Sequence, residues 1–283
     1  MINLGILVLH YGHSKLTKEC IKSILKSKDL NFKILVIDNF SPEPFISNSK
    51  KVEVIRLKEN KGFAGGINFG MRILFKKFNN ILILNNDTIL NSDTISKLQK
   101  SYSSGSIQAP IIYNMYTKEI EEYGGSLNTF SMYYKDLESI PIQKTKVEYL
   151  TGACLLFDKE VYQKLESFPE EYFMYSEDMD FNIKAKLKGV DLYIEPNSTL
   201  FHSKGASSGG LSPFTIYYIH RNRFLLGKKY NHGLNKIIFL VFYTFLIFLK
   251  TIKWFFKKPS LAPYFVLGFL DGLKNKKGKS ERF

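Results

Sequence analysis

The chain has 283 residues, enough for one large domain with an appendage. Hydrophobic residues make up 45% and charged residues 23%, proportions that fit a globular protein and exclude long disordered tracts. Cys20 and Cys154 lie far apart in apolar runs, which argues against a disulfide framework and against a cysteine-rich metal site.

The formal net charge of +14 comes mainly from the C-terminal part of the chain. Residues 227–283 hold 12 of the 40 Lys and Arg but only 2 of the 26 Asp and Glu. These cations flank an apolar run and are not interleaved with aromatic residues across a folded face. The pattern therefore predicts an anionic membrane surface as a partner and argues against nucleic acid.

Runs of strand length alternate with amphipathic stretches in the first third of the chain. We expect strands at 2–9, 32–37, 52–57 and 81–84, with helices between the first pair and between the last pair. This alternation predicts an α/β fold with a mostly parallel sheet that helices cover on both faces. Ligands bind such sheets at the carboxyl ends of the strands.

The segment after each predicted strand is polar or rich in glycine, and all four should meet at one rim of the sheet. The segments are residues 10–12, 38–41, 59–66 and 85–88. Their coincidence is a stronger signal for a binding site than any one of them.

The later part of the chain is predicted less evenly. Residues 105–150 show short alternating segments with turn signals and no firm pattern. Beyond them the sequence predicts helices from 159, at 177–188 and at 217–229, and short strands at 191–194 and 199–202.

The strongest apolar stretch, Ile237–Leu249, lies between lysines. Thirteen helical residues span about 20 Å, less than the roughly 30 Å hydrocarbon core of a bilayer. We expect a helix or helical hairpin embedded in one leaflet. A full span over 234–256 would require Lys250 and Lys253 to reach the interface, and a buried helix of a soluble domain is the third alternative. The N-terminal apolar run, which lacks a basic region and a cleavage site, does not read as a signal peptide.

Asp87 follows a predicted strand in the run Asn85-Asn86-Asp87-Thr88. Its carboxylate at the rim is suited to a hard divalent ion, Mn²⁺ or Mg²⁺, which bridges protein carboxylates and substrate phosphates. The alternative is a turn that caps a helix starting near Ser92.

Glu177 and Asp178 follow an aromatic loop and open a predicted helix, with Asp180 two residues later. A carboxylate there can take a proton from a hydroxyl as general base, and the nearby aromatic rings can stack on sugars. Acidic residues also favour helix N-termini for purely structural reasons.

His202 ends a predicted strand and enters a small-residue loop that begins with Ser203 and Lys204. His202 is a candidate metal ligand or diphosphate contact. The loop after it is a candidate lid that would exclude water. A lone histidine after an apolar strand is more often structural.

Gly62, Gly65, Gly66 and Gly70 do not have the spacing of a dinucleotide fingerprint and follow the third strand, which argues against a Rossmann oxidoreductase. Glycines at a helix start can let backbone amides approach a phosphate or a sugar. A tight turn without a ligand is the alternative.

In order, these segments resemble glycosyltransferase family 2, with its GT-A nucleotide-sugar fold, and especially its rhamnosyltransferase-like branch. The resemblance runs from about residue 2 to residue 230 and rests on six blocks: 38–41, 60–68, 84–88, 149–153, 173–180 and 202–205. It implies a GT-A domain at 1–230, followed by a basic membrane-associated helical tail at 231–283.

The resemblance also implies roles for single residues. Asp38 would read the donor's base, with Tyr11 stacking beside it, although His10 and Gly12 depart from the usual flanking residues. Asp87 ends the D-x-D-like motif, in which Asn85 replaces the first Asp; His202 would contact metal or diphosphate, and Asp178 would be the general base. The remaining expected donor-binding residues are Asn39, Ser41, Gly62, Gly65, Gly66, Asn68 and Asn86.

The resemblance thus implies an inverting, metal-dependent single displacement in which Asp178, with Glu177 beside it, serves the acceptor hydroxyl. Rhamnose from dTDP-rhamnose is the first candidate donor, and a lipid-linked bacterial glycan at the cytoplasmic face of the plasma membrane is the expected acceptor. A nucleotidyltransferase of related topology and a non-catalytic, membrane-bound glycan-binding module are the alternatives.

Overall fold

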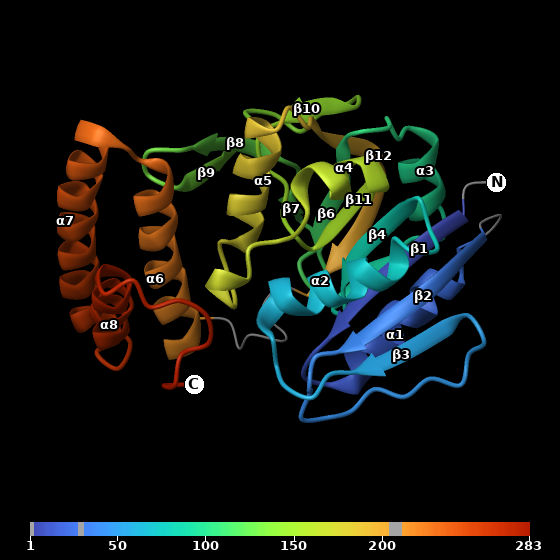
Figure 1. Ribbon diagram of the computed structural model, residues 1–283, viewed down its shortest axis with the longest axis horizontal. Helices are drawn as coiled ribbons and strands as arrows, with labels where there is room; N and C mark the ends of the chain where they lie inside the picture. The colour runs from blue at the N-terminus through green and yellow to red at the C-terminus, as the bar shows by residue number, and fades with distance from the viewer. Residues whose placement is uncertain (1–2, 28–30, 204–210) are drawn as a thin grey trace.

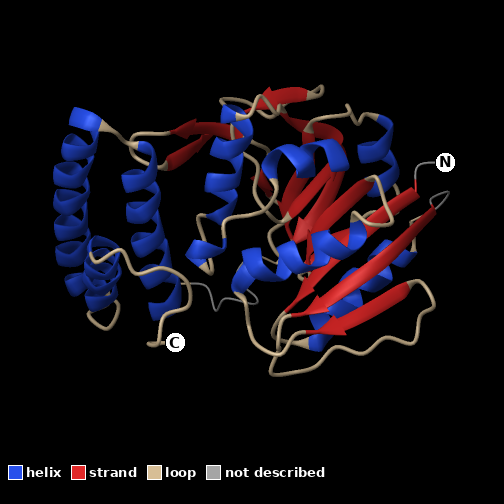
Figure 2. Cartoon of the chain, in the orientation of Figure 1, coloured by secondary structure: helices blue, strands red, loops and turns tan. Residues whose placement is uncertain are grey.

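The computed structural model describes residues 3–27, 31–203 and 211–283. A ten-stranded sheet forms the centre, with helices on both faces, and three long helices gather at one end (Figures 1 and 2). The strands are β1 Asn3–His10, β2 Asn31–Asp38, β3 Val52–Arg56, β4 Asn80–Asn85, β5 Thr88–Leu90, β6 Ile107–Asn114, β7 Ile120–Glu122, β8 Gly125–Asn128, β9 Tyr133–Asp136, β10 Thr145–Val147, β11 Cys154–Asp158 and β12 Leu192–His202. The helices are α1 Ser14–Leu25, α2 Gly62–Leu74, α3 Thr94–Lys100, α4 Lys159–Leu165, the short 3₁₀ helix Glu170–Tyr172, α5 Glu177–Leu187, α6 Pro213–Tyr230, α7 Gly233–Lys257 and α8 Ala262–Leu273.

The four strands predicted in the first third of the chain are confirmed as β1 to β4, and the two helices between them as α1 and α2. They lie in the parallel order β3-β2-β1-β4. The register pairs His10 with Asp38 across β1 and β2, and Leu9 with Asn85 across β1 and β4. Since His10, Asp38 and Asn85 end their strands, the polar segments that follow them start at one rim.

Side chains alternate between the two faces of the sheet because successive residues of a strand point to opposite sides. In β1, Leu7 and Leu9 join the core under α2, whereas Ile6 and Val8 join the core under α1. All four are buried, and each contributes about 1.5–3 kcal/mol to folding.

The second half of the sheet places residues 149–153 beside the end of β4. β11 runs antiparallel to β4, and the backbone N–H of Asn85 donates to the carbonyl of Ala153 over 2.9 Å. The two short strands predicted at 191–194 and 199–202 are one strand, β12, which pairs with β6 on both sides of a register shift between Glu195 and Thr199.

The three helices at the end of the molecule pack on one another. α6, α7 and α8 share an aromatic core of Ile216, Phe224, Phe239, Tyr243, Ile247, Leu261, Phe265 and Phe269. The predicted apolar helix is confirmed within α7 and is longer than expected. Length and composition would let α7 cross a membrane, and 17% of its most apolar window is buried. The division of the chain at residue 230 stays a prediction. Helix α6, which ends at that residue, packs both on α7 and α8 and, through Leu225 and Leu226, on the sheet domain.

Candidate active site

Asp87 and His202 meet at the rim of the sheet. Thr88 in β5 pairs with His202 in β12, and the N–H of Ser203 donates to the carbonyl of Asp87 over 2.9 Å. Nε2 of His202 therefore lies 3.2 Å from Oδ1 of Asp87, with both side chains largely buried. Asp87 thus stands between two strands and does not cap a helix.

The pair has an acidic neighbour, Glu121, that the sequence did not suggest. Oε2 of Glu121, in β7, lies 3.9 Å from Nδ1 of His202. At 3.9 Å Glu121 is too far from His202 to share a hydrogen bond with it, and it adds a second carboxylate close to Asp87 and His202.

The residues present fit a divalent cation only if the substrate completes its shell. Among the described residues, no group of three His, Cys, Asp or Glu side chains is arranged to hold a metal ion. Mn²⁺ and Mg²⁺ are commonly bound through one or two protein ligands together with phosphate oxygens and waters. Asp87 and His202 match that kind of site.

Asp178 lies in the first turn of α5, with its carboxylate held in place from two sides. The hydroxyl of Tyr149 donates to Oδ2 over 2.8 Å, and the N–H of Met179 donates to Oδ1 over 2.8 Å. Burial raises the pKa of Asp178 above its ordinary value, although the hydrogen bond from Tyr149 acts in the opposite direction. A raised pKa makes a carboxylate a stronger proton acceptor when it is ionised.

Glu177, next to Asp178, is buried, with one carboxylate oxygen, Oε2, lacking a hydrogen-bond partner among the described residues. Burial, and then the charge of Asp178, raise the pKa of Glu177 to about 8. Such a group costs stability when it ionises, and costs of this kind concentrate at functional sites.

Short contacts connect Asp178 to the strand end that carries Asp87. A methyl group added at Gly152 would lie 3.6 Å from Cβ of Asp178. The next residue, Ala153, accepts a hydrogen bond from Asn85, two residues before Asp87. The backbone that carries Asp178 therefore lies close to the strand end that carries Asp87.

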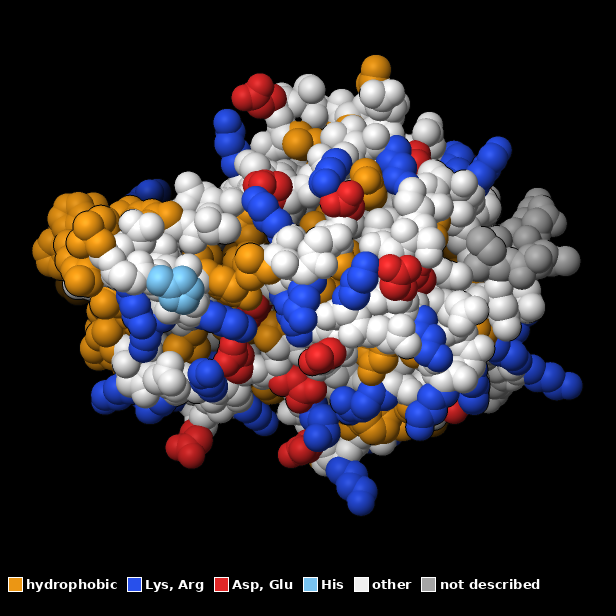
Figure 3. Space-filling model, turned by 45° about the horizontal axis from the view of Figure 1, so that its top comes forward, with side chains coloured by type: hydrophobic (Ala, Val, Ile, Leu, Met, Phe, Trp, Pro, Cys, Tyr) orange, Lys and Arg blue, Asp and Glu red, His pale blue; other side chains and the backbone are white. Residues whose placement is uncertain are grey.

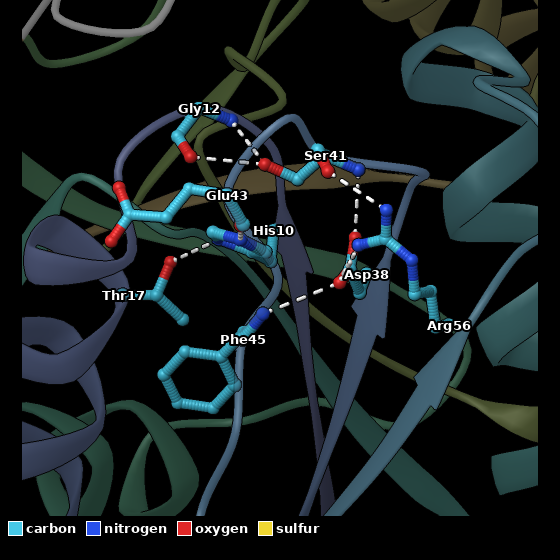
Figure 4. A network of polar contacts seen from close by, with 8 residues as sticks. All are labelled: His10, Gly12, Thr17, Asp38, Ser41, Glu43, Phe45 and Arg56. Carbon is cyan, nitrogen blue, oxygen red and sulfur yellow. Dashed lines mark hydrogen bonds and ion pairs between the residues drawn. The ribbon is translucent and has the colours of Figure 1, made fainter.

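Asp38 lies at this rim as well, but its carboxylate is engaged by the protein. It accepts from the N–H groups of Ser41 and Phe45, and from Nη1 of Arg56 over 2.6 Å (Figure 4). Asp38 has no exposed surface. In this arrangement it holds the loop after β2 in place, and its expected contact with the donor's base stays a prediction.

The hydroxyl of Ser41 closes that loop against the one after β1. It accepts from the N–H of Gly12 and donates to the carbonyl of the same residue. Beside it, both ring nitrogens of His10 are engaged, by Thr17 and by the carbonyl of Glu43 (Figure 4). The side chain of Tyr11 has no hydrogen-bond partner within residues 3–27, 31–203 and 211–283, and it is partly exposed at the rim.

The three asparagines expected at the donor site have structural partners. Asn39 bonds the backbone of Lys61 and Gly62, and Asn86 donates to Thr17. Asn68 both donates to and accepts from the backbone of Phe168, which fixes α2 against the loop before α5. Their roles in donor binding stay predictions.

Close packing explains why two of these positions, 62 and 66, are occupied by glycine. A methyl group at Gly62 would lie 2.1 Å from the carbonyl oxygen of Phe173, and one at Gly66 would lie 2.4 Å from Leu9. Gly62 also has a φ of +72°, which favours glycine. At Gly65 a methyl group would meet Cβ of Lys61. Binding of the donor by these glycines stays a prediction.

Sequence reasoning missed several residues that organise the rim, namely Arg56, Glu121, Tyr149, Arg221 and Asn222. Tyr149 stood in one of the six matched blocks, which was its only signal. The predicted contact of Lys204 and the lid formed by its loop fall on residues 204–210, outside the described residues.

The fold is that of known sugar-transferring enzymes. It matches TarS from S. aureus, residues 1–349 in complex with UDP-GlcNAc, with a TM-score of 0.61 at 14% identity, covering 97% of this chain and 82% of that one. It also matches GalNAc-T7 with UDP, GalNAc and Mn²⁺, with a TM-score of 0.63 at 16% identity, over 80% of this chain but only 47% of that one. Together these two likenesses show that the fold is of the GT-A type.

The sequence comparisons give the family. The model of glycosyl transferase family 2 matches residues 6–166, more than half of the chain, and the protein belongs to that family. A low-salt glycan biosynthesis hexosyltransferase of Haloferax volcanii is 25% identical over 99% of this chain and 94% of its own length. A dTDP-rhamnosyl transferase of Shigella flexneri is 24% identical over 89% of each chain.

Proposed function

We propose that the protein is an inverting glycosyltransferase that moves a sugar from a nucleoside diphosphate to a hydroxyl of a lipid-linked precursor of a bacterial surface polysaccharide. The observation that carries this proposal is the placement of Asp178. Its carboxylate has a raised pKa and is held by Tyr149, and its backbone lies close to the strand end that carries Asp87.

In the proposed reaction Asp178 takes the proton from the acceptor hydroxyl. The oxygen attacks the anomeric carbon from the side opposite the nucleoside diphosphate, whose bond to the sugar breaks as the new bond forms. One displacement inverts the anomeric configuration. No second carboxylate is needed as a nucleophile.

Asp87 and His202 would hold Mn²⁺ or Mg²⁺ against the donor diphosphate. The cation, when bound, neutralises the charge that develops on the departing phosphate. Glu121 adds a further negative charge near this pair, which favours a cation there.

Rhamnose from dTDP-rhamnose is the first donor to test, because the Shigella relative carries that name and aligns over nearly its whole length. UDP-galactose and UDP-N-acetylhexosamines come next, since TarS is similar in fold and was crystallised with UDP-GlcNAc.

The exposed face of α7 supports an attachment to the membrane. Hydrophobic side chains gather over the end of the molecule where α7 lies (Figure 3). They are Leu234, Ile237, Ile238, Val241, Phe242, Phe245, Phe248, Leu249, Ile252, Phe255 and Phe256. An apolar surface this continuous is rare on soluble monomers, and Lys253, Lys257 and Lys258 at its end would meet anionic lipid.

We favour a helix that lies in one leaflet over one that crosses the membrane. The middle of α7 is tied to the sheet domain, because Nζ of Lys250 donates to the hydroxyl of Tyr133 and Phe130 packs on Phe239. A crossing helix would draw that polar hairpin, β8–β9, into the hydrocarbon. The proposed location is the cytoplasmic face of the plasma membrane.

The test is a donor screen with the full chain and an undecaprenyl-diphosphate-linked acceptor, with and without Mn²⁺ or Mg²⁺. We expect release of nucleoside diphosphate, and a product with inverted anomeric configuration by NMR. Asp178→Asn should lower kcat by about 10²–10⁴, whereas the exposed Asp136→Asn is the matched control. Release of pyrophosphate would instead favour a nucleotidyltransferase, and no turnover with any donor would favour a binding module.

A further inference from the structure

The loop that leads into Asp178 has a strained backbone. Phe173, Tyr175 and Ser176 all have φ near +70°, with values of 65°, 68° and 73°. Side chains other than glycine avoid this region, so such a loop persists only where its surroundings hold it. Glu177 and Asp178 follow it directly.

Two adjacent residues of α6, Arg221 and Asn222, hold the loop in this conformation by hydrogen bonds. The side-chain amide of Asn222 donates to the carbonyls of Tyr172, Met174 and Tyr175 over 2.7–2.9 Å. Nη2 of Arg221 donates to the carbonyl of Tyr172 over 2.9 Å. Together they reach three of the four residues before Ser176.

Arg221 is almost fully buried, at 1% exposure. Its other contacts are the side-chain oxygen of Asn222, the carbonyl of Gly278, and the faces of the Tyr217 and Tyr218 rings. A buried guanidinium that bonds mainly neutral oxygens is costly, which points to a role beyond packing.

The far end of the chain completes the arrangement. The N–H of Gly278 donates to the carbonyl of Glu171 over 2.7 Å, while its own carbonyl accepts from Arg221 over 2.8 Å. Lys277 pairs with the side chain of Glu171, and the N–H of Ser280 donates to the hydroxyl of Tyr218. Part of the basic charge of the tail is therefore directed at the sheet domain, not at lipid.

The segment that carries these contacts is fixed on α6. A methyl group at Gly268 of α8 would lie 2.5 Å from the carbonyl of Tyr217, which shows how closely the two helices approach. Phe283 packs against Phe214, Tyr217 and Tyr218. The C-terminus lies beside the start of α6 (Figure 1).

We propose that residues 276–283, the C-terminal clasp, are a positioning element of the active site. The clasp locks Arg221 and Glu171, and Arg221 and Asn222 hold the loop 172–176 in the shape that aims Asp178 at the acceptor. The tail therefore does more than attach the protein to a membrane. This inference rests on the proposed function of Asp178 as the base.

The experiment compares the full chain with a chain that ends at Asn275, using the most active donor and Mn²⁺. We expect kcat to fall about 10- to 100-fold, because small displacements of a reacting group cost rates of this order. The KM for the donor should change less than about twofold, and binding to phosphatidylglycerol vesicles should not change, because α7 remains.

A second variant covers the case in which the shortened chain does not fold. Gly278→Pro removes the N–H that bonds Glu171 and cannot adopt the φ of +70° found there, and should lower kcat in the same way. Arg223→Ala is the control. Arg223 follows Asn222 in α6, but its guanidinium stacks on Tyr133 and not on the loop 172–176.

The outcomes separate the clasp from the proposed function. Unchanged kcat in both the shortened chain and Gly278→Pro, with Asp178→Asn inactive, would overturn the clasp and leave the function standing. Loss of kcat in step with loss of vesicle binding would also overturn it, since the segment would then be an anchor. Full activity of Asp178→Asn would refute the function itself.

Discussion

The hydroxyl of Tyr149 donates a hydrogen bond of 2.8 Å to Oδ2 of Asp178, and it does so from the loop that precedes β11. The bond stabilises the ionised carboxylate, so it lowers the pKa of Asp178 against the larger upward effect of burial. Tyr149 thereby keeps the proposed base ionised down to a lower pH than burial alone would allow.

Tyr149→Phe should therefore move the acidic limb of the pH profile of kcat/KM to higher pH. The pKa of Asp178, already raised, rises further without the hydrogen bond, and the base is active only above it. We expect a loss of about 10-fold at neutral pH, partly regained at higher pH. Tyr193→Phe, which removes a hydroxyl that donates to Asp191 at the surface, should leave the profile unchanged.

Glu177→Gln should stabilise the fold at neutral pH. The folded-state pKa of Glu177, about 8, exceeds its ordinary value of 4.5, so the folded state binds the extra proton between these values. Stability is thus lost as pH rises through this window. The glutamine removes that loss, a gain on the order of 4 kcal/mol at pH 8 that shrinks toward pH 5.

Urea denaturation at pH 5, 6.5 and 8 measures the effect of Glu177→Gln. The exposed Glu119→Gln is the control and should show no such trend. Equal stability of Glu177→Gln and the unmodified protein at all three pH values would mean that Glu177 has no raised pKa.

Arg56→Leu should destabilise the protein, because it leaves the carboxylate of Asp38 buried without its cation. Arg56 is itself 38% exposed, so solvent screens part of the pair, and we expect a loss of about 1–3 kcal/mol in urea denaturation. Arg72→Leu, on the exposed side of α2, should cost less than about 0.5 kcal/mol. If both cost the same, Asp38 is not held by Arg56.

The rim was predictable because of how parallel strands are arranged. The runs at β1, β2, β3 and β4 each end in a polar segment, and parallel strands deliver such segments to one edge. Asp87, Asp178 and His202 each had a structural alternative in the bare sequence, and the resemblance to glycosyltransferase family 2 selected them.

Side-chain partners were not predictable, because they come from distant parts of the chain and leave no period in the sequence. Asp38 meets Arg56 only once β2 and β3 pair, and Asn68 meets Phe168 across the helix layer. Arg221 looks like an ordinary helix cation until Gly278 and Tyr172 close around it. The region 105–150 was unclear because the strands after β6 have only three or four residues each and pair in two different sheets.

The exposed face of α7 gives a prediction for membrane binding. Phe245 and Phe248 are 59% and 58% exposed, and burying each in lipid contributes about 1.5–3 kcal/mol. The double variant Phe245→Glu and Phe248→Glu should therefore weaken binding to phosphatidylglycerol vesicles about 100-fold or more, measured by co-sedimentation. Higher salt should weaken binding of the unmodified protein as well, because ions screen the attraction between Lys253, Lys257 or Lys258 and the anionic surface.

Ile142→Glu is the matched control for this experiment, because Ile142 is 94% exposed on the sheet domain, away from α7. It adds one of the two negative charges of the α7 variant, at an even more exposed apolar position, so a general effect of added charge would appear in both proteins. Only the α7 variant should lose the vesicles while it keeps the transfer rate with a short, water-soluble acceptor. Undiminished sedimentation of the α7 variant would place the membrane contact elsewhere on the molecule.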